Sequence, residues 1–468
     1  MKTNLAVKQP VQHTAEGAVA ACITPEQELR RTVAACMLWE SAFYECGESI
    51  ADRIKGLVPK CRPEFVAATA FEARTKMNLR HAPLLLVREM ARHPEHRLLV
   101  AKLLPDVIQR ADELAEFVSV YWQGGERQCS FCVGRIGRVV TTCEDCMGSG
   151  VLKGKKEPLS KQVKTGLANA FGKFNEYALA KYNRDGAVKL RDVLFLCHAK
   201  PKDDEQAALW KKLVDGKLVT PDTWEVALSG GADKRETFER LMVDGKLGAL
   251  AFLRNLRNMH EAGVSKELVG GYAAALDIKR VLPFRFIAAA RAVPQWEDML
   301  EPLMLTAVAA QPKMQGRTVL AVDVSGSMND KISAKGDMTR LDAAAALAIL
   351  LREVCENFEV FAFDTTIYPV APRRGFALRD AIGKTRGGTD ISRAVTHANS
   401  LGGDRLIVLT DEQSHTRVGA PKAKHSYMVN VATNKNGVGY GNGWQHIDGW
   451  SEAVIDYLQE FENQQAQA

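Results

Sequence analysis

Residues 317–328 read RTVLAVDVSGSM, and this stretch decides the fold of the carboxyl-terminal part of the chain. Its apolar run predicts a buried strand, and the polar segment 323–327, DVSGS, predicts a metal-binding loop at the end of that strand. The chain before it is basic and has helical patterns, whereas the chain after it alternates strand and helix patterns. We therefore expect two kinds of architecture to meet near this stretch.

The residues that follow predict a doubly wound α/β domain. We expect strands at 317–323, 358–363, 404–410 and 426–432, and helices at 340–356, 375–384, 390–401 and 450–461. In such sheets, ligands bind at the carboxyl ends of the strands. Two further polar segments, 387–390 (GGTD) and 409–411 (LTD), are expected to join the 323–327 loop there.

Five oxygen-bearing side chains from these segments form a candidate metal site: Asp323, Ser325, Ser327, Thr389 and Asp411. The pattern resembles the metal-ion-dependent adhesion site of A domains. Hydroxyl and carboxylate oxygens suit a hard divalent cation, with Mg²⁺ expected before any other. The alternative is that the D-x-S-x-S segment only caps a helix. In adhesion-type A domains a partner carboxylate completes the coordination, so the resemblance implies a docking site for a protein.

The composition is typical of a folded soluble protein. With 468 residues, 46% of them hydrophobic and 25% charged, the chain has the length for roughly two to four domains. No uncharged apolar run reaches about eighteen residues, so no membrane span is expected. Polar residues interrupt residues 1–23, which we expect to form a flexible tail without a secretion signal. The expected location is cytoplasmic.

Between residues 24 and 312 the sequence predicts many short helices and no strands. The helical patterns lie at 25–45, 64–77, 82–92, 96–103, 105–122, 160–182, 189–197, 204–213, 221–228, 234–242, 246–259, 263–276 and 283–292. Such helix density indicates an α-solenoid, in which each helix buries its apolar face on its neighbours. No fixed repeat length is evident.

Residues 127–151 interrupt the helices and hold two close pairs of cysteines. Cys129 and Cys132 form the first C-x-x-C pair, and Cys143 and Cys146 form the second. Four thiolates at this spacing predict a closed, structural Zn²⁺ site of zinc-ribbon type. The metal would contribute on the order of 10 kcal/mol to the folding of a segment with few apolar residues. The alternatives are a redox dithiol or cysteines without a joint role. Residues 143–150 also resemble one repeat of the zinc domain of DnaJ-type chaperones.

The positive charge is concentrated just after this segment. Residues 1–310 carry a net charge of +7 and residues 311–468 carry −1, and the window 151–200 alone holds eleven basic and four acidic side chains. Such a concentration points to a polyanionic partner. Lys161 and Lys164 would share one face of a helix, and His198 follows a cluster of four basic residues, so the hypothesis is a phosphate-binding surface. The cluster comprises Lys181, Arg184, Lys189 and Arg191. The alternative is an ordinary solvated helix surface.

Five separated blocks resemble the TROVE-domain proteins, the Ro autoantigen family. They are residues 181–184 (KYNR), 190–201 (LRDVLFLCHAKP), 248–259 (GALAFLRNLRNM), 281–290 (VLPFRFIAAA) and 320–328 (LAVDVSGSM). The resemblance implies a ring of HEAT-like helical repeats at 24–312, followed by a von Willebrand factor A domain at 313–468. It also implies binding of noncoding RNA, with Y RNA on the outer basic surface and single-stranded ends of misfolded RNA in the central hole.

The resemblance assigns roles to particular residues. Lys181, Arg184 and His198 match RNA-contacting positions of the family, and Lys161 and Lys164 match a basic pair on the preceding helix. Arg184 is displaced by one residue from the family spacing. The segment 127–151 departs from the animal members and resembles an insertion. It either extends the RNA-binding surface or braces the ring.

The sequence thus predicts a monomeric RNA-binding scaffold in RNA quality control or processing. Its expected partners are Y-like noncoding RNA, misfolded RNA ends, and an exoribonuclease or another protein docking at the A domain. No nucleophile with an attendant base is evident, so we do not expect an enzyme. The alternative is a metal-dependent protein interaction module without RNA binding.

Overall fold

The computed structural model describes a defined part of the chain. The described residues are 12–13, 19–20, 24–34, 47–77, 79–122, 126–128, 132, 143–144, 151–153, 157–278, 281, 283–309, 313–332, 337–414, 416–432, 443–448, 454–455, 458–459 and 461–462. The chain divides into two compact units, one formed by Ile54–Pro221 and the other by Met1–Arg53 together with Asp222–Ala468.

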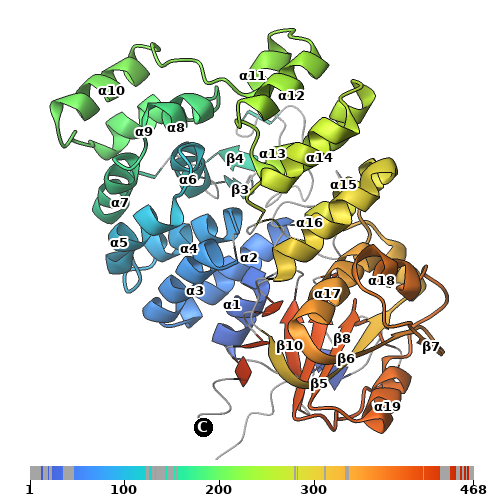
Figure 1. Ribbon diagram of the computed structural model, residues 1–468. Helices are drawn as coiled ribbons and strands as arrows, with labels where there is room; N and C mark the ends of the chain where they lie inside the picture. The colour runs from blue at the N-terminus through green and yellow to red at the C-terminus, as the bar shows by residue number, and fades with distance from the viewer. Residues whose placement is uncertain are drawn as a thin grey trace, which may run out of the picture. The chain divides into compact units, whose positions relative to one another are not determined.

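The unit Ile54–Pro221 is helical. Its helices are α3 (Pro63–Thr75), α4 (His81–Arg92), α5 (Arg97–Val107), α6 (Asp112–Trp122), α7 (Lys161–Phe171), α8 (Glu176–Tyr182), α9 (Leu190–Cys197) and α10 (Asp204–Val214), and α2 (Gly47–Leu57) leads into it. Successive helices pack side by side, α3 on α4 and α5, α5 on α7, and α7 on α9 (Figure 1). This arrangement confirms the predicted helical array.

Two predicted helix boundaries in this unit are wrong. The pattern at 160–182 is two helices, because α7 ends at Phe171 and the Asn175 side chain accepts the Ala178 N–H at 2.9 Å, which starts α8. The pattern at 105–122 also breaks. There the buried Glu113 carboxylate accepts the N–H groups of Gln109 and Arg110 at 2.8 and 3.0 Å, which fixes a turn between α5 and α6.

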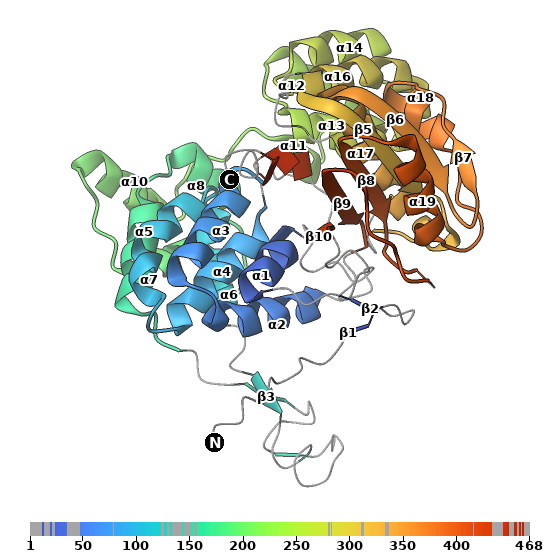
Figure 2. The same cartoon turned by 90° about the horizontal axis from the view of Figure 1, so that it is seen from below.

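The second unit combines helices with an α/β sheet. Its helical part holds α1 (Pro25–Ala34), α11 (Trp224–Ser229), α12 (Lys234–Val243), α13 (Ala249–Glu261), α14 (Lys266–Ala275), α15 (Pro283–Ala292) and α16 (Glu297–Ala309). Helices α12, α14 and α16 lie beside one another, as Figure 2 shows. Helix α16 was not predicted from the sequence, and neither was α2.

The sheet has six strands in the order β10-β9-β8-β5-β6-β7. They are β5 (Met314–Asp323), β6 (Cys355–Phe363), β7 (Ile367–Pro369), β8 (Arg405–Thr410), β9 (His425–Asn430) and β10 (Gln445–Asp448). All pairs are parallel except β6 with β7. The doubly wound α/β fold is confirmed, although the short outer strands β7 and β10 of this sheet were not predicted from the sequence. The expectation of no strands between residues 24 and 312 is wrong, because two short strands lie at Glu126–Gln128 and Val151–Lys153.

The two faces of β5 carry different cores, as the alternation of side chains along a strand requires. Leu320 and Val322 belong to the core covered by α17 (Arg340–Val354) and α18 (Gly375–Ile382), and Val319 and Ala321 to the core covered by α19 (Ile391–Leu401). Figure 1 shows α17 and α18 together, away from α19. The sheet is therefore buried on both faces.

The helical part and the sheet of this unit share one hydrophobic core. Buried residues of α15 and α16 belong to the same cluster as those of α17 and α18. One ion pair and one hydrogen bond join the same elements, since Arg379 pairs with Glu297 at 3.1 Å and Glu301 accepts the Phe376 N–H at 2.7 Å. The predicted domain boundary at residue 312 therefore lies beside a packed interface.

The cysteine-rich segment starts and ends in a pair of short strands. Strand β3 (Glu126–Gln128) pairs antiparallel with β4 (Val151–Lys153), with Gln128 opposite Val151. The two ends of the segment that connects these strands are therefore adjacent. Cys132 and Cys143 are buried, whereas Cys129 and Cys146 lie outside the described residues.

Within the described parts of the chain, no helix is long and apolar enough to cross a membrane.

The packing of α5 on α7 predicts the effect of a small substitution. A Cβ at Gly166 of α7 would lie 2.8 Å from Leu104 Cβ and 3.3 Å from Ala101 Cα. We expect Gly166→Ala to lower the free energy of unfolding by about 1–3 kcal/mol, because overpacking outweighs the helix propensity of alanine. Urea denaturation followed by circular dichroism measures the change.

Gly271→Ala is the matched control in α14, where a Cβ would meet no atom within 4 Å. Because only the helix propensity of the residue changes here, we expect the free energy of unfolding to rise by up to about 1 kcal/mol. Equal stability of the two variants would contradict the close contact of α5 with α7.

Candidate functional site

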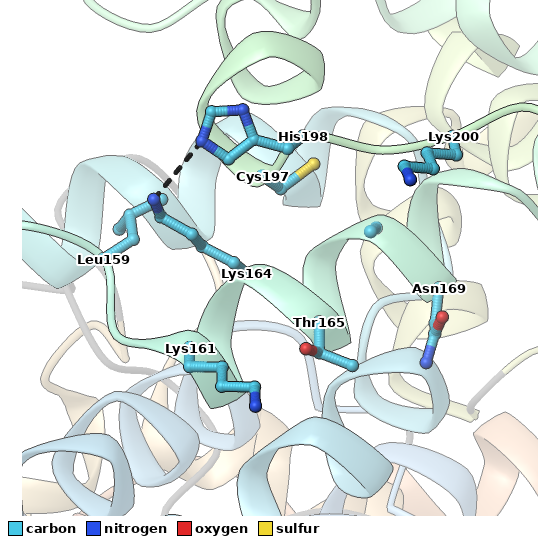
Figure 3. A pocket seen from close by; sticks show the side chains of 9 residues that line it. Leu159, Lys161, Lys164, Thr165, Asn169, Cys197, His198 and Lys200 are labelled. Carbon is cyan, nitrogen blue, oxygen red and sulfur yellow. Dashed lines mark hydrogen bonds between the residues drawn. The ribbon is translucent and has the colours of Figure 1, made fainter.

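A cationic pocket lies between the first turns of α7 and the end of α9. It has a volume of about 520 Å³, and its walls include Lys161 and Lys164 from α7 and His198 and Lys200 from the end of α9 (Figure 3). Thr165, Ala168 and Asn169 continue the α7 wall, and Leu159 and Cys197 complete the lining. We call this feature the cationic pocket.

The local sequence determines where α7 begins and where α9 ends, and so where these side chains lie. Ser160 caps α7 by accepting the Val163 N–H, so Lys161 is the first residue of the helix. Lys164, Thr165 and Ala168 follow at helical spacing. His198 ends α9 in the left-handed conformation, with φ of 53°, and the Ala199 N–H reaches back to Leu194 O. This turn carries His198 and Lys200 to the pocket.

The charges of the pocket have one sign. Lys164 Nζ lies 3.4 Å from His198 Nε2, and no lining residue is acidic. Within the described part of the chain, no ion pair involves Lys161, Lys164 or Lys200. Burial raises the pKa of the Cys197 thiol, so this sulfur is neutral near pH 7. The pocket therefore presents cationic, hydroxyl and amide groups without a compensating carboxylate, which suits an anion.

The structure brings three of the five predicted contact residues together and leaves two outside the pocket. Lys161, Lys164 and His198 line it, whereas Lys181 and Arg184 do not. Lys181 Nζ lies 5.6 Å from the centre of the Tyr177 ring, and Arg184 lies exposed in the loop after α8. The two residues can still extend the basic surface beyond the pocket.

Sequence reasoning missed several residues of this region. Lys200, Thr165 and Asn169 line the pocket, and the helical spacing from Lys161 through Thr165 to Asn169 could have indicated the latter two. The aromatic rings were also missed. Tyr177 is 53% exposed and Phe195 is 60% exposed. Phe195 stands in an apolar run, so no sequence signal marked it as a surface residue.

The second candidate site lies at the carboxyl end of β5. Asp323 is the last residue of that strand, and its two carboxylate oxygens accept the Ser325 N–H at 2.8 Å and the Thr410 hydroxyl at 2.6 Å. The hydroxyl oxygens of Ser325 and Ser327 are 3.2 Å apart. Three of the five predicted ligands are thus adjacent.

Neighbouring loops bring in the other two. We call residues 325–327 the serine loop. The Gly326 N–H donates to Gly387 O at 2.8 Å, which connects this loop to the segment before Thr389. Strand β8 pairs with β5 so that Val322 faces Leu409, which places Asp411 just beyond the end of β5. Thr389 is 7% exposed, and Asp411, like Asp323, is fully buried.

The electrostatics of this site favour a cation. Burial, together with the charge of Asp411, raises the pKa of Asp323 to about 7. Two buried carboxylates with adjacent hydroxyl groups are a donor set that fits a hard divalent cation, which would relieve the repulsion. Arg340 also reaches the site, because its Nη1 lies 3.2 Å from Asp411 Oδ2. Sequence reasoning did not single out Arg340.

No further metal site is visible in the residues that the structure describes. They contain no group of three or more histidine, cysteine, aspartate or glutamate side chains that could hold a metal ion. The candidate site at β5 has only two acidic ligands, because its other three ligands are hydroxyl groups. Two of the four cysteines of the predicted zinc site, Cys129 and Cys146, lie outside the described residues.

Two family models match the chain. One, described as the TROVE domain, matches residues 210–341, and the other, described as the Ro60 vWA domain, matches residues 317–433. The second match contains all five predicted ligands of the site at β5. The cationic pocket precedes residue 210 and lies outside both matches, so its assignment rests on its geometry and on the resemblance of residues 181–201.

Two known proteins are similar to this chain, one in structure and one in sequence. The crystal structure of the Ro (RSR) protein of Deinococcus radiodurans matches with a TM-score of 0.63 and 19% identity, covering 94% of this chain and 99% of that one. At this identity the likeness shows the fold. Telomerase protein component 1 of Mus musculus is 37% identical over 90 residues, which are 18% of this chain and 3% of that protein. The chain thus corresponds to a small part of that relative.

Proposed function

The chain belongs to the Ro-type TROVE proteins, and we propose from this premise that it is an RNA-binding scaffold of a ribonucleoprotein. The observation that carries the proposal is the cationic pocket, where Lys161, Lys164, His198 and Lys200 converge without a carboxylate. Cationic side chains that face a phosphate backbone release its counterions on binding, which gives affinity that falls as salt rises. The proposed ligand is therefore an RNA strand whose phosphates enter the pocket.

The proposed RNA is Y-like noncoding RNA together with single-stranded ends of misfolded RNA. The family resemblance suggests both, and the exposed rings of Phe195 and Tyr177 support the single-stranded part. Unpaired bases stack on exposed aromatic rings, whereas bases inside a duplex do not reach them. RNA quality control or processing is the role that such binding would serve.

The proposed function includes no catalytic step on RNA. The pocket lining offers lysine, histidine, hydroxyl and amide groups, which bind and orient phosphates. Cleavage of RNA by a metal-dependent route would need carboxylate ligands beside the phosphate. The lining residues of the pocket include no carboxylate. An exoribonuclease recruited as a partner would then perform any cleavage.

The A domain would hold a divalent cation and dock a protein. We propose Mg²⁺ as the ion, bound by Asp323, Ser325, Ser327, Thr389 and Asp411. A bound cation supplies a positive centre that a carboxylate of a partner protein can complete. The same site supports the alternative function, a metal-dependent interaction module that binds no RNA.

We further propose a structural Zn²⁺ held by Cys129, Cys132, Cys143 and Cys146. The pairing of β3 with β4 supports this proposal, because it brings the two ends of the segment side by side. The burial of Cys132 and Cys143 is also as expected for thiolate ligands.

Removing the pocket charges tests the proposed RNA site. We expect the triple variant Lys161→Glu, Lys164→Glu and Lys200→Glu to weaken binding of a single-stranded RNA. Its salt dependence should also flatten, by roughly 0.7 log units of affinity per log unit of salt for each lost phosphate contact on a single strand. Fluorescence anisotropy across a salt series measures both effects.

Two controls accompany this test. Charge reversal at the exposed residues Lys60, Lys211 and Lys217, which do not line the pocket, should change affinity much less. Asp323→Ala should leave RNA affinity unchanged. The proposed location is wrong if the pocket variant and the surface control bind RNA equally well at every salt concentration.

The exposed ring of Phe195 predicts selectivity for unpaired RNA. We expect Phe195→Ala to weaken binding of single-stranded RNA by about 1–3 kcal/mol, the usual loss per stacked base, and to leave binding of a duplex unchanged. Phe195→Trp should retain the affinity. Competition binding with single-stranded and duplex RNA of equal length measures the difference.

Leu98→Ala is the matched control, because Leu98 is 74% exposed in α5 of the same unit but has no ring. This variant should bind both RNAs as the unmodified protein does. An equal loss of affinity for single-stranded and duplex RNA in Phe195→Ala would argue against stacking.

The zinc proposal predicts metal content. We expect one zinc ion per chain by mass spectrometry of the intact protein, and its loss in the double variant Cys129→Ser and Cys146→Ser, because both thiolate pairs are then incomplete. Cys61→Ala, which removes a buried cysteine outside the segment, should keep the zinc. A metal-free unmodified protein, purified without chelators in zinc-supplemented buffer, would refute the site.

A further inference from the structure

Arg340 stands at the candidate metal site of the A domain although it is none of the predicted ligands. It is the first residue of α17, and it is only 3% exposed. A guanidinium remains charged at every physiological pH, and burying one without compensation costs several kcal/mol. Its partners therefore show what the charge is used for.

The guanidinium joins two acids and the serine loop. Nη1 donates to Ser327 O at 3.0 Å and lies 3.2 Å from Asp411 Oδ2, and Nη2 lies 3.2 Å from Asp330 Oδ2. The two acids differ in their surroundings. The Asp411 side chain is fully buried, whereas the Asp330 side chain is 61% exposed. One cation thus bridges a ligand of the proposed metal site and an acid at the surface.

The other carboxylate of the site, that of Asp323, forms its hydrogen bonds with neutral groups. Asp323 accepts the Ser325 N–H and the Thr410 hydroxyl, which are neutral donors. Arg340 therefore supplies positive charge to one of the two buried acids, Asp411. A divalent cation bound by Asp411 would meet a like charge about one hydrogen bond away from this ligand.

We propose that Arg340 is a built-in competitor for the divalent cation and sets the affinity of this site. While Arg340 is bonded to Asp411, the charge of that acid is compensated without a metal. When the cation binds, Arg340 releases Asp411 and keeps its ion pair with Asp330. Asp330 thereby makes metal binding easier, since it provides the guanidinium with a second partner. The ion concerned is a hard divalent cation such as Mg²⁺ or Mn²⁺.

This proposal is independent of RNA binding. It concerns only the oxygen ligands at the end of β5 and the residue that neutralises one of them. It rests on the divalent-cation site proposed for the A domain. Failure of the unmodified chain to bind Mn²⁺ would contradict that site, whereas Mn²⁺ binding that Arg340→Met does not tighten would contradict this inference alone.

Calorimetric titration of the full chain with Mn²⁺ tests the proposal. We expect Arg340→Met, which removes the charge at similar volume, to bind Mn²⁺ about tenfold more tightly than the unmodified protein, because the competitor is gone. The midpoint of thermal unfolding should also rise more on adding Mn²⁺ in this variant. Arg340→Lys, which keeps a cation, should stay within about threefold of the unmodified affinity.

We expect Asp330→Asn to change the affinity for Mn²⁺ in the opposite direction. Without its second partner Arg340 stays on Asp411, so Mn²⁺ should bind about threefold to tenfold more weakly. In the double variant of Arg340→Met with Asp330→Asn, the effect of Asp330→Asn should largely vanish, since Asp330 acts through Arg340. An undiminished effect in the double variant would instead show a direct loss of attraction between the Asp330 carboxylate and Mn²⁺, and would overturn the proposal.

Further results would also overturn the inference. One is a folded Arg340→Met protein that binds Mn²⁺ no more tightly than the unmodified chain, or not at all. If Arg340→Met does not fold, the test rests on Asp330→Asn, and unchanged or tighter Mn²⁺ binding in that variant contradicts the proposed role.

Discussion

The hydrogen bonding of β5 on both of its edges is the constraint on which the carboxyl-terminal site depends. This strand pairs in parallel with β6 on one side and β8 on the other, and both of its faces are buried. It cannot slip by one residue without turning its core side chains to the wrong face. Asp323 is therefore held at the edge of the sheet, and the register with β8 brings Asp411 beside it.

The two candidate sites solve opposite electrostatic problems. The site at β5 buries two carboxylates, and the Arg340 guanidinium pairs with one of them, Asp411. The cationic pocket gathers lysine and histidine side chains at a surface and leaves them without an acid among its lining residues. Uncompensated charge of one sign is costly in a folded protein unless solvent or a ligand offsets it. The first site is thus arranged for a cation and the second for a polyanion.

Packing around the sheet has a consequence for the helices that precede it. Helices α15 and α16 share a core with α17 and α18, and the Glu297 and Glu301 side chains of α16 bond to residues of α18. The end of the TROVE match and the start of the vWA match overlap in the chain, at residues 317–341. Substitutions in α16 should therefore change the stability of the α/β sheet as well as that of the helices.

The sequence alone determined the fold classes, the doubly wound sheet and the position of Asp323, because strand periodicity and the polar end of a strand are local signals. It also located the basic window by composition. Only the tertiary structure decided which lysines share a pocket, since α7 and α9 come together by packing and the window itself extends past Lys181 and Arg184. It also decided that Phe195 is exposed, and that Arg340 meets Asp411 although 71 positions separate them. Contacts of this kind depend on which faces pack, and an individual segment holds no signal for them.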